Sequence, residues 1–277
     1  MRVGWLVAVG IAACVSSVAV AQTADEIAAE LANPATPMSS LGNHLEYRTF
    51  DGDLPGATDQ EALIYTFQPS MPFPQGDGSQ IIALRPAIPI IIDQPLYGES
   101  GFTDEGPELG DIAFDFVYGG TSKEGAIRMV GLFGVLPTAT DDALGADQWR
   151  LGPEVFLGKI RPWGVVGALI FHQWDVGGDN DEATSLTSLN YVYSFNLGGG
   201  YQLASGPTIT YDWEADSDQA WTVPLGVGLA KTVIAGKTPL KMQAQVFYNV
   251  EAPDAFAQEW GVKLSLTPVV KNPFVGD

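Results

Sequence analysis

Residues 184–216 read TSLTSLNYVYSFNLGGGYQLASGPTITYDWEAD and contain two alternating runs separated by three glycines. In the first run, apolar side chains take every second position from Leu189 to Leu197, and Ser and Asn take most positions between them. This period of two predicts a strand with unlike faces. In a soluble sheet the apolar face would meet a core, whereas in a membrane barrel it would meet lipid and the polar face a lumen. The run alone fits both.

The first 21 residues have the pattern of an export signal. Arg2 supplies a positive charge, an apolar stretch follows, and Ala19 and Ala21 precede Gln22. We therefore expect a signal peptide over residues 1–21 and a periplasmic N-terminal segment over residues 22–40. Cys14 is the only cysteine, so the mature chain should have no disulfide. Cleavage directly before Cys14 is the alternative, and it would leave a lipidated N-terminus.

The formal net charge is −20 over 277 residues. Such a chain repels phosphate polymers, so we expect no nucleic-acid partner. No later stretch offers about 18 uninterrupted apolar residues, so we expect no helical membrane span. Composition does not change after Pro37, which indicates one domain over residues 41–277.

Short alternating or apolar runs, punctuated by Gly, Pro, Asn and Asp, continue from Leu41 to the C-terminus. No long stretch keeps a helical period, so the pattern is all-β. The expected strands are Leu41–Asp51, Glu61–Phe73, Ser79–Ile92, Leu109–Gly119, Gly125–Pro137, Asp147–Gly158, Pro162–Trp174, Thr184–Leu197, Gly200–Trp213, Ala220–Val233, Thr238–Val250 and Ala257–Val269. These strands number about twelve, and each is long enough to cross an outer membrane at a tilt.

The connections between these strands alternate in length and charge. Counted from the N-terminus, the odd connections are long and acidic, whereas the even ones are short and hold Lys123, Lys159, Arg161 and Lys237. An outer-membrane barrel sorts its connections in this way, because its short turns face the periplasm and its long loops face outward. The sequence therefore predicts a transmembrane, antiparallel, up-and-down β-barrel in the cell outer membrane.

Aromatic residues fit the same interpretation. Five tryptophans fall near expected strand ends, where an interfacial girdle belongs: Trp149, Trp163, Trp213, Trp221 and Trp260. The alternative is that these rings pack the core of a soluble exported β protein, which the sorting of the loops argues against.

Several segments resemble the meta-pathway of phenol degradation family of bacterial outer-membrane proteins, which are often described as transporters. The matching stretches are 33–34 (NP), 68–73 (QPSMPF), 85–89 (RPAIP), 109–112 (LGDI), 164–179 (GVVGALIFHQWDVGGD), 207–210 (PTIT) and 221–226 (WTVPLG). The resemblance implies a barrel that passes small, aromatic or apolar compounds. The chain departs from the usual barrel ending, because Val275-Gly276-Asp277 follows Phe274 in place of a terminal aromatic residue.

If the apolar face of each strand meets lipid, the residues that alternate with it line the lumen. The candidate pore-lining residues are Arg85, Asp111, Asp115, Arg128, Arg150, Glu154, His172, Asp212, Lys241, Glu259 and Lys263. Both signs of charge occur, which fits a wet channel or, equally, a closed interior held by salt bridges.

We expect no catalytic residues, no cofactor and no metal centre. The sequence contains no G-x-S-x-G element, and the other histidine, His44, is far from His172. A catalytic role for His172 is therefore not expected, and a hydrogen bond in the lumen or at its rim is the preferred role. Acidic loops around Asp179 and Asp216 hold oxygen ligands that could take divalent cations, but neither has EF-hand spacing.

The leading hypothesis is a non-enzymatic channel or facilitator for the passive passage of small molecules. The alternative is a structural or adhesive barrel with a closed, salt-bridged lumen. Expected partners are outer-membrane lipid, lipopolysaccharide and a small solute, with divalent cations as candidates at the acidic loops. Twelve strands do not decide between the hypotheses, because about eight pack shut with side chains and sixteen leave a channel.

Overall fold

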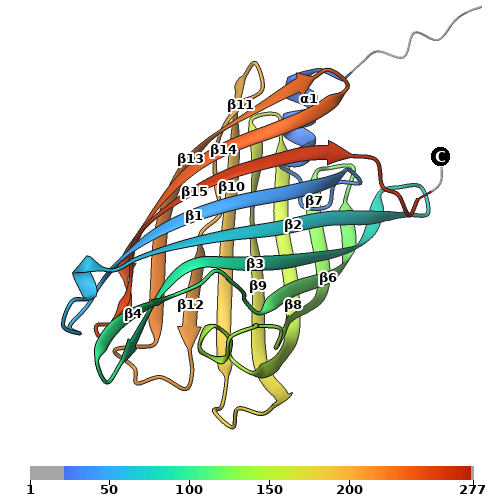
Figure 1. Cartoon of the computed structure of the whole chain (residues 1–277). Coiled ribbons are helices and arrows are strands. Elements are labelled where there is room, and N and C mark those ends of the chain that lie inside the picture. Colours follow the sequence, from blue (N-terminus) through green and yellow to red (C-terminus); the bar gives the residue numbers. More distant parts are fainter. Residues whose placement is uncertain (1–21, 276–277) are drawn as a thin grey trace, which may run out of the picture.

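The chain folds into a closed antiparallel barrel of twelve strands in a computed structural model that describes residues 22–275 (Figure 1). The first strand pairs with the last, from Ser39 opposite Val270 to Asp51 opposite Ala257, and this pairing closes the barrel. The predicted fold class and strand number are confirmed. The predicted signal peptide and the alternative lipidation of Cys14 lie outside the described residues.

Continuous strands make ten of the twelve spans, and two spans are broken. The continuous strands are β1 (Ser39–Asp51), β2 (Glu61–Gln75), β3 (Gln80–Gly98), β7 (Ala126–Leu136), β8 (Gln148–Arg161), β9 (Gly164–Gly178), β10 (Ser185–Gly198), β13 (Trp221–Ala235), β14 (Thr238–Glu251) and β15 (Ala257–Val270). The broken spans are β5 (Glu108–Leu109) with β6 (Ile112–Thr121), and β11 (Tyr201–Ser205) with β12 (Thr208–Asp212). Gly206 and Pro207 break the second, because glycine weakens a strand and proline has no N–H for the ladder.

Short turns and long loops lie at opposite ends of the barrel. Figure 1 shows the helix α1 (Ala24–Leu31) at the end with the short turns, and β4 (Gly101–Glu105), which forms an arm with the extended end of β3, at the other. The long-loop end also carries two short 3-10 helices, η1 (Ala57–Asp59) and η2 (Asp142–Leu144).

In the short turn between β2 and β3, the hydroxyl and N–H of Ser79 donate to Asp77 and hold the pKa of that carboxyl below its usual range.

The outer surface of the barrel is apolar. Leu264 on β15 is 51% exposed, and each of the five tryptophans of the expected girdle is well exposed. Such a belt is costly in water and stable in hydrocarbon, and a closed barrel leaves no sheet edge unsatisfied. The protein is therefore an outer-membrane barrel. Within residues 22–275, no helix is long and apolar enough to cross a membrane.

A small apolar core fills the inside of the barrel at its short-turn end. Ala35, from the segment between α1 and β1, packs there against buried side chains of β3, β6, β7, β8 and β9. These side chains are Ile81, Ala83, Val117, Ile127, Met129, Phe156 and Val165. The N-terminal segment is thus part of the barrel interior at this end.

Candidate channel lumen

The N-terminal segment, residues 22–38, lies across the short-turn end of the lumen. Thr23 and Glu26 form a capping box that starts α1. The Asp25 carboxylate accepts hydrogen bonds from the N–H groups of Gly199 and Gly200 in the β10–β11 turn. These charge-assisted bonds fix the helix to the rim of the barrel.

Two further contacts hold this segment from inside the barrel. The amide nitrogen of Gln202 donates to the Ala28 carbonyl at 3.1 Å. On the opposite wall, the Asn33 amide donates to Thr121 Oγ1 at 3.1 Å. The sequence analysis expected residues 22–40 in the periplasm as a segment separate from the barrel, whereas the structure packs most of them against its inner wall.

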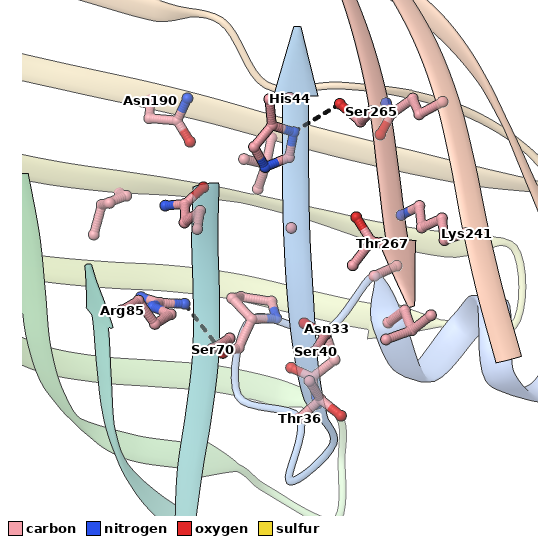
Figure 2. A pocket seen from close by; sticks show the side chains of 18 of the residues that line it. Asn33, Thr36, Ser40, His44, Ser70, Arg85, Asn190, Lys241, Ser265 and Thr267 are labelled. Carbon is pink, nitrogen blue, oxygen red and sulfur yellow. Dashed lines mark hydrogen bonds between the residues drawn. The ribbon is translucent and has the colours of Figure 1, made fainter. Parts of the chain in front are cut away.

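A polar cavity of about 410 Å³ lies on the lumen side of the segment. Figure 2 shows its lining side chains converging from several strands, with His44 Nδ1 and Ser265 Oγ 2.8 Å apart. A second cavity of about 230 Å³ shares Asn190, Lys241 and Gln243 with the first. The two cavities are therefore adjacent on the inner face.

Ion pairs line the lumen on both sides of its middle. Nearer the short turns, Arg85 Nε lies 2.6 Å from Asp115 Oδ1, and Arg85 also donates to the Pro34 carbonyl at 3.5 Å. Nearer the long loops, Glu46 pairs with Arg48 at 2.8 Å and with Lys263 at 3.3 Å beside a third cavity of about 240 Å³. Charge pairs of this kind offset the cost of burying either sign alone.

Three charged side chains of the inner face lack such a partner: Lys241, Glu154, and Arg150, whose buried Nε has no hydrogen-bond partner among residues 22–275. Lys241 lines the large cavity (Figure 2), and no carboxylate of the described chain lies within 4.0 Å of its Nζ atom. Glu154 is only 3% exposed, and neither of its oxygens has a hydrogen-bond partner among residues 22–275. Gly131 directly opposite Glu154 makes room for it, because a Cβ there would lie 2.8 Å from Oε1.

Most candidate pore-lining residues lie on the expected inner face. These are Arg85, Asp115, Arg150, Glu154, Lys241 and Lys263. Asp111 and Asp212 lie at the loop end and serve local structure. Asp111 accepts N–H groups of Thr138, Ala139 and Ala146, and Asp212 accepts the N–H of Glu214.

The predicted inward position is wrong for two candidates. Arg128 is exposed on the outer face of β7, between the inward Ile127 and Met129. His172 also lies on the outer face, where its ring lies against that of Trp174 in a tilted arrangement and makes a 2.7 Å hydrogen bond with Thr187 Oγ1.

A further candidate, Glu259, is the extra residue of a bulge. Phe50 pairs with Gln258 and Thr49 with Trp260, so Glu259 has no partner in β1. Gln258 lines the cavity in its place. Bulges change the alternation of faces along a strand.

The sequence analysis missed several polar residues of the lumen. They are His44, Glu46, Arg48, Asn190 and Gln243. The alternation of Leu45 and Tyr47 with Glu46 and Arg48 was a sufficient signal for two of them. Over the described part of the chain, no group of three or more His, Cys, Asp or Glu side chains could hold a metal ion.

Comparison with known proteins shows the fold. No family model matches the chain, and no curated protein matches it. Among solved structures, the chain is similar to the COG4313 outer membrane channel from Pseudomonas putida F1, with a TM-score of 0.64 and 13% identity over 84% of this chain and 96% of that one. It is also similar to the NanC porin, with a TM-score of 0.51 and 10% identity over 83% of this chain and 99% of that one.

Proposed function

We propose that the protein is a passive outer-membrane channel for small molecules. The observation that supports it most is the cavity of about 410 Å³ on the lumen side of the N-terminal segment, which is lined mainly by polar residues and adjoins a second cavity of about 230 Å³. A barrel with a purely structural role needs no such space, because side chains of a narrow barrel can fill its interior. The two similar solved structures, a channel and a porin, agree with this proposal.

The proposed solutes are small, and aromatic or apolar compounds are among them. The resemblance to the phenol meta-pathway family supports this class. The wall of the lumen adds apolar surface to its polar groups, since Phe156, Leu169 and Val192 line the main cavity together with Asn190 and Lys241. Passage of this kind follows the concentration gradient and needs no cofactor.

A closed structural barrel is the second candidate. Two observations favour it: the N-terminal segment lies across one end of the lumen, and the ion pairs Arg85–Asp115 and Glu46–Lys263 tie neighbouring strands together. In this proposal the acidic outer loops would contact another molecule.

Swelling of liposomes in neutral sugars separates the two candidates. We expect liposomes that contain the purified protein to swell faster than protein-free liposomes, with a rate that falls as the sugar becomes larger. A protein that leaves swelling at the protein-free rate for the smallest sugar would support the closed barrel and contradict the channel.

A further inference from the structure

The barrel wall has a seam between the broken strand β11/β12 and strand β13. Leu203 pairs with Leu229 and Thr210 pairs with Thr222. These two ladders share one register, but the six residues 223–228 of β13 have no ladder partner in β11 or β12. Elsewhere adjacent strands are joined along most of their length, as in the unbroken ladder from Leu240 to Tyr248 between β14 and β15.

The sequence explains why backbone pairing fails here. In the shared register Gly206 would face Gly226, with Pro207 and Pro224 beside them. Proline cannot donate to a ladder, and glycine weakens a strand interior. Two prolines and two glycines thus meet at one place in the wall.

Side chains bridge this seam where backbone hydrogen bonds are missing. On the outer face, the hydroxyls of Tyr191 and Tyr193 on β10 reach past β11/β12 and donate to the carbonyls of Pro224 at 2.9 Å and Gly226 at 2.8 Å. On the inner face, Gln243 donates to the Ala204 carbonyl at 3.0 Å. Rotation about side-chain bonds can release such contacts without unfolding a strand.

The lumen reaches this seam from inside. Gly206 lines both the cavity of about 230 Å³ and the cavity of about 240 Å³. The first of these is lined by Tyr193 of the outer face as well as by Gln243 of the inner face. The second is lined by Pro207 and Pro224. Both cavities therefore border the seam.

We propose that this seam is a lateral opening through which small, uncharged aromatic or apolar molecules pass between the lumen and the outer membrane. This inference rests on the proposed channel function and adds a route to it. Direct transfer of an apolar solute into hydrocarbon is favourable, because its apolar surface leaves water. Release of Tyr191 and Tyr193 would open the seam, whereas charged solutes would stay in the polar lumen.

A disulfide across the seam tests the proposal. A Cβ on Gly226 would lie 2.7 Å from Ser205 Oγ, so Ser205→Cys with Gly226→Cys places two thiols within bonding reach once the Phe247 ring turns aside. Val246→Cys with Val262→Cys, directly opposite each other on β14 and β15, is the matched control. Uptake of labelled naphthalene by cells and single-channel conductance in KCl are measured before and after reduction.

We expect the oxidised seam variant to lose protein-dependent naphthalene uptake, to regain it on reduction, and to keep the conductance of the parent throughout. The control disulfide should change neither. Naphthalene uptake that persists when the seam disulfide is fully formed would overturn the lateral opening. The same conclusion would follow if the parent protein conducts ions but cells that contain it take up no more naphthalene than cells that lack it. A parent that passes neither ions nor naphthalene would instead contradict the channel function itself.

A second variant covers the case in which the cysteine pair fails to fold. Tyr191→Phe with Tyr193→Phe removes both hydroxyl contacts and keeps the lipid-facing rings. We expect faster naphthalene uptake at unchanged conductance, and Tyr248→Phe on the outer face of β14 is the control. An uptake rate equal to that of the parent would contradict a gate held by these hydroxyls.

Discussion

Leu264 projects from the middle of β15 into the lipid-facing belt. Replacing it with Arg should lower the free energy of unfolding by about 2–4 kcal/mol, because a charge on the lipid face near the midplane must be dehydrated. Thr267 on the same strand lines the large cavity, so Thr267→Arg should lower the free energy of unfolding much less. Equilibrium unfolding of both variants in lipid vesicles measures the difference, and equal losses would contradict the assignment of faces.

Lys241 is the clearest determinant of selectivity in the lumen. Its ammonium group lines the large cavity without a carboxylate within 4.0 Å among the described residues, so it should repel cations. We expect Lys241→Gln to shift the reversal potential in a KCl gradient toward greater cation preference. Lys237→Gln, in the turn between β13 and β14, is the control. A shift toward anions in Lys241→Gln would contradict this role.

Single residues also show where alternation fails as a guide to faces. On β7 the inward residues Ile127 and Met129 are apolar because Ala35 of the N-terminal segment packs against them. The inner face of β7 is therefore not marked by polar residues, and the sequence could not show on which face Arg128 lies. His172 lies close to the long-loop end, next to the aromatic ring of Trp174. Outer faces near a membrane interface accept polar groups, which makes polarity ambiguous there.

At the scale of elements, α1 and the residues that follow it control the short-turn end of the lumen. Asp25→Ala removes the bonds to Gly199 and Gly200, and charge-assisted hydrogen bonds contribute about 1.5–3 kcal/mol each. We expect this variant to show more frequent openings in single-channel recordings. Asp104→Ala in the β3–β4 arm removes an acid at the other end and should leave the openings unchanged. Unchanged openings in both variants would contradict a closing role for α1.

The strands themselves could be predicted closely, whereas the plugging segment could not. From Leu41 to Val269 each expected strand overlaps an observed span, because lipid on one side and polar groups on the other impose a period of two. The amphipathic helix α1 is short, and its partners Gln202 and Thr121 are far away in sequence. Nothing local indicates that its apolar face, with Ile27 and Ala28, is covered by the barrel.

For the whole molecule, the sorting of the connections fixes the orientation in the membrane. Asp181→Cys, in the long connection between β9 and β10, should react with a membrane-impermeant maleimide on intact cells. Lys237→Cys, in a short turn, should react only after the outer membrane is permeabilised. Labelling of position 237 in intact cells would reverse the orientation.

The same sorting predicted the closed barrel, but openness depends on side chains that meet only after folding. Arg85 with Asp115, Glu46 with Lys263, and the seam at Gly206 each join residues from different strands. Strand number alone does not decide whether twelve strands enclose a passage. The cavities and their lining are therefore what the structure adds to the sequence.

Single-channel conductance in a planar bilayer tests the channel most directly, for the chain over residues 22–277 and for a variant of it that lacks residues 24–36. Removal of this segment deletes α1 and Ala35 from the short-turn end of the lumen. We predict discrete current steps for the full chain and larger steps for the shortened one. A folded barrel that gives no steps in either form would contradict the channel and support the closed structural barrel.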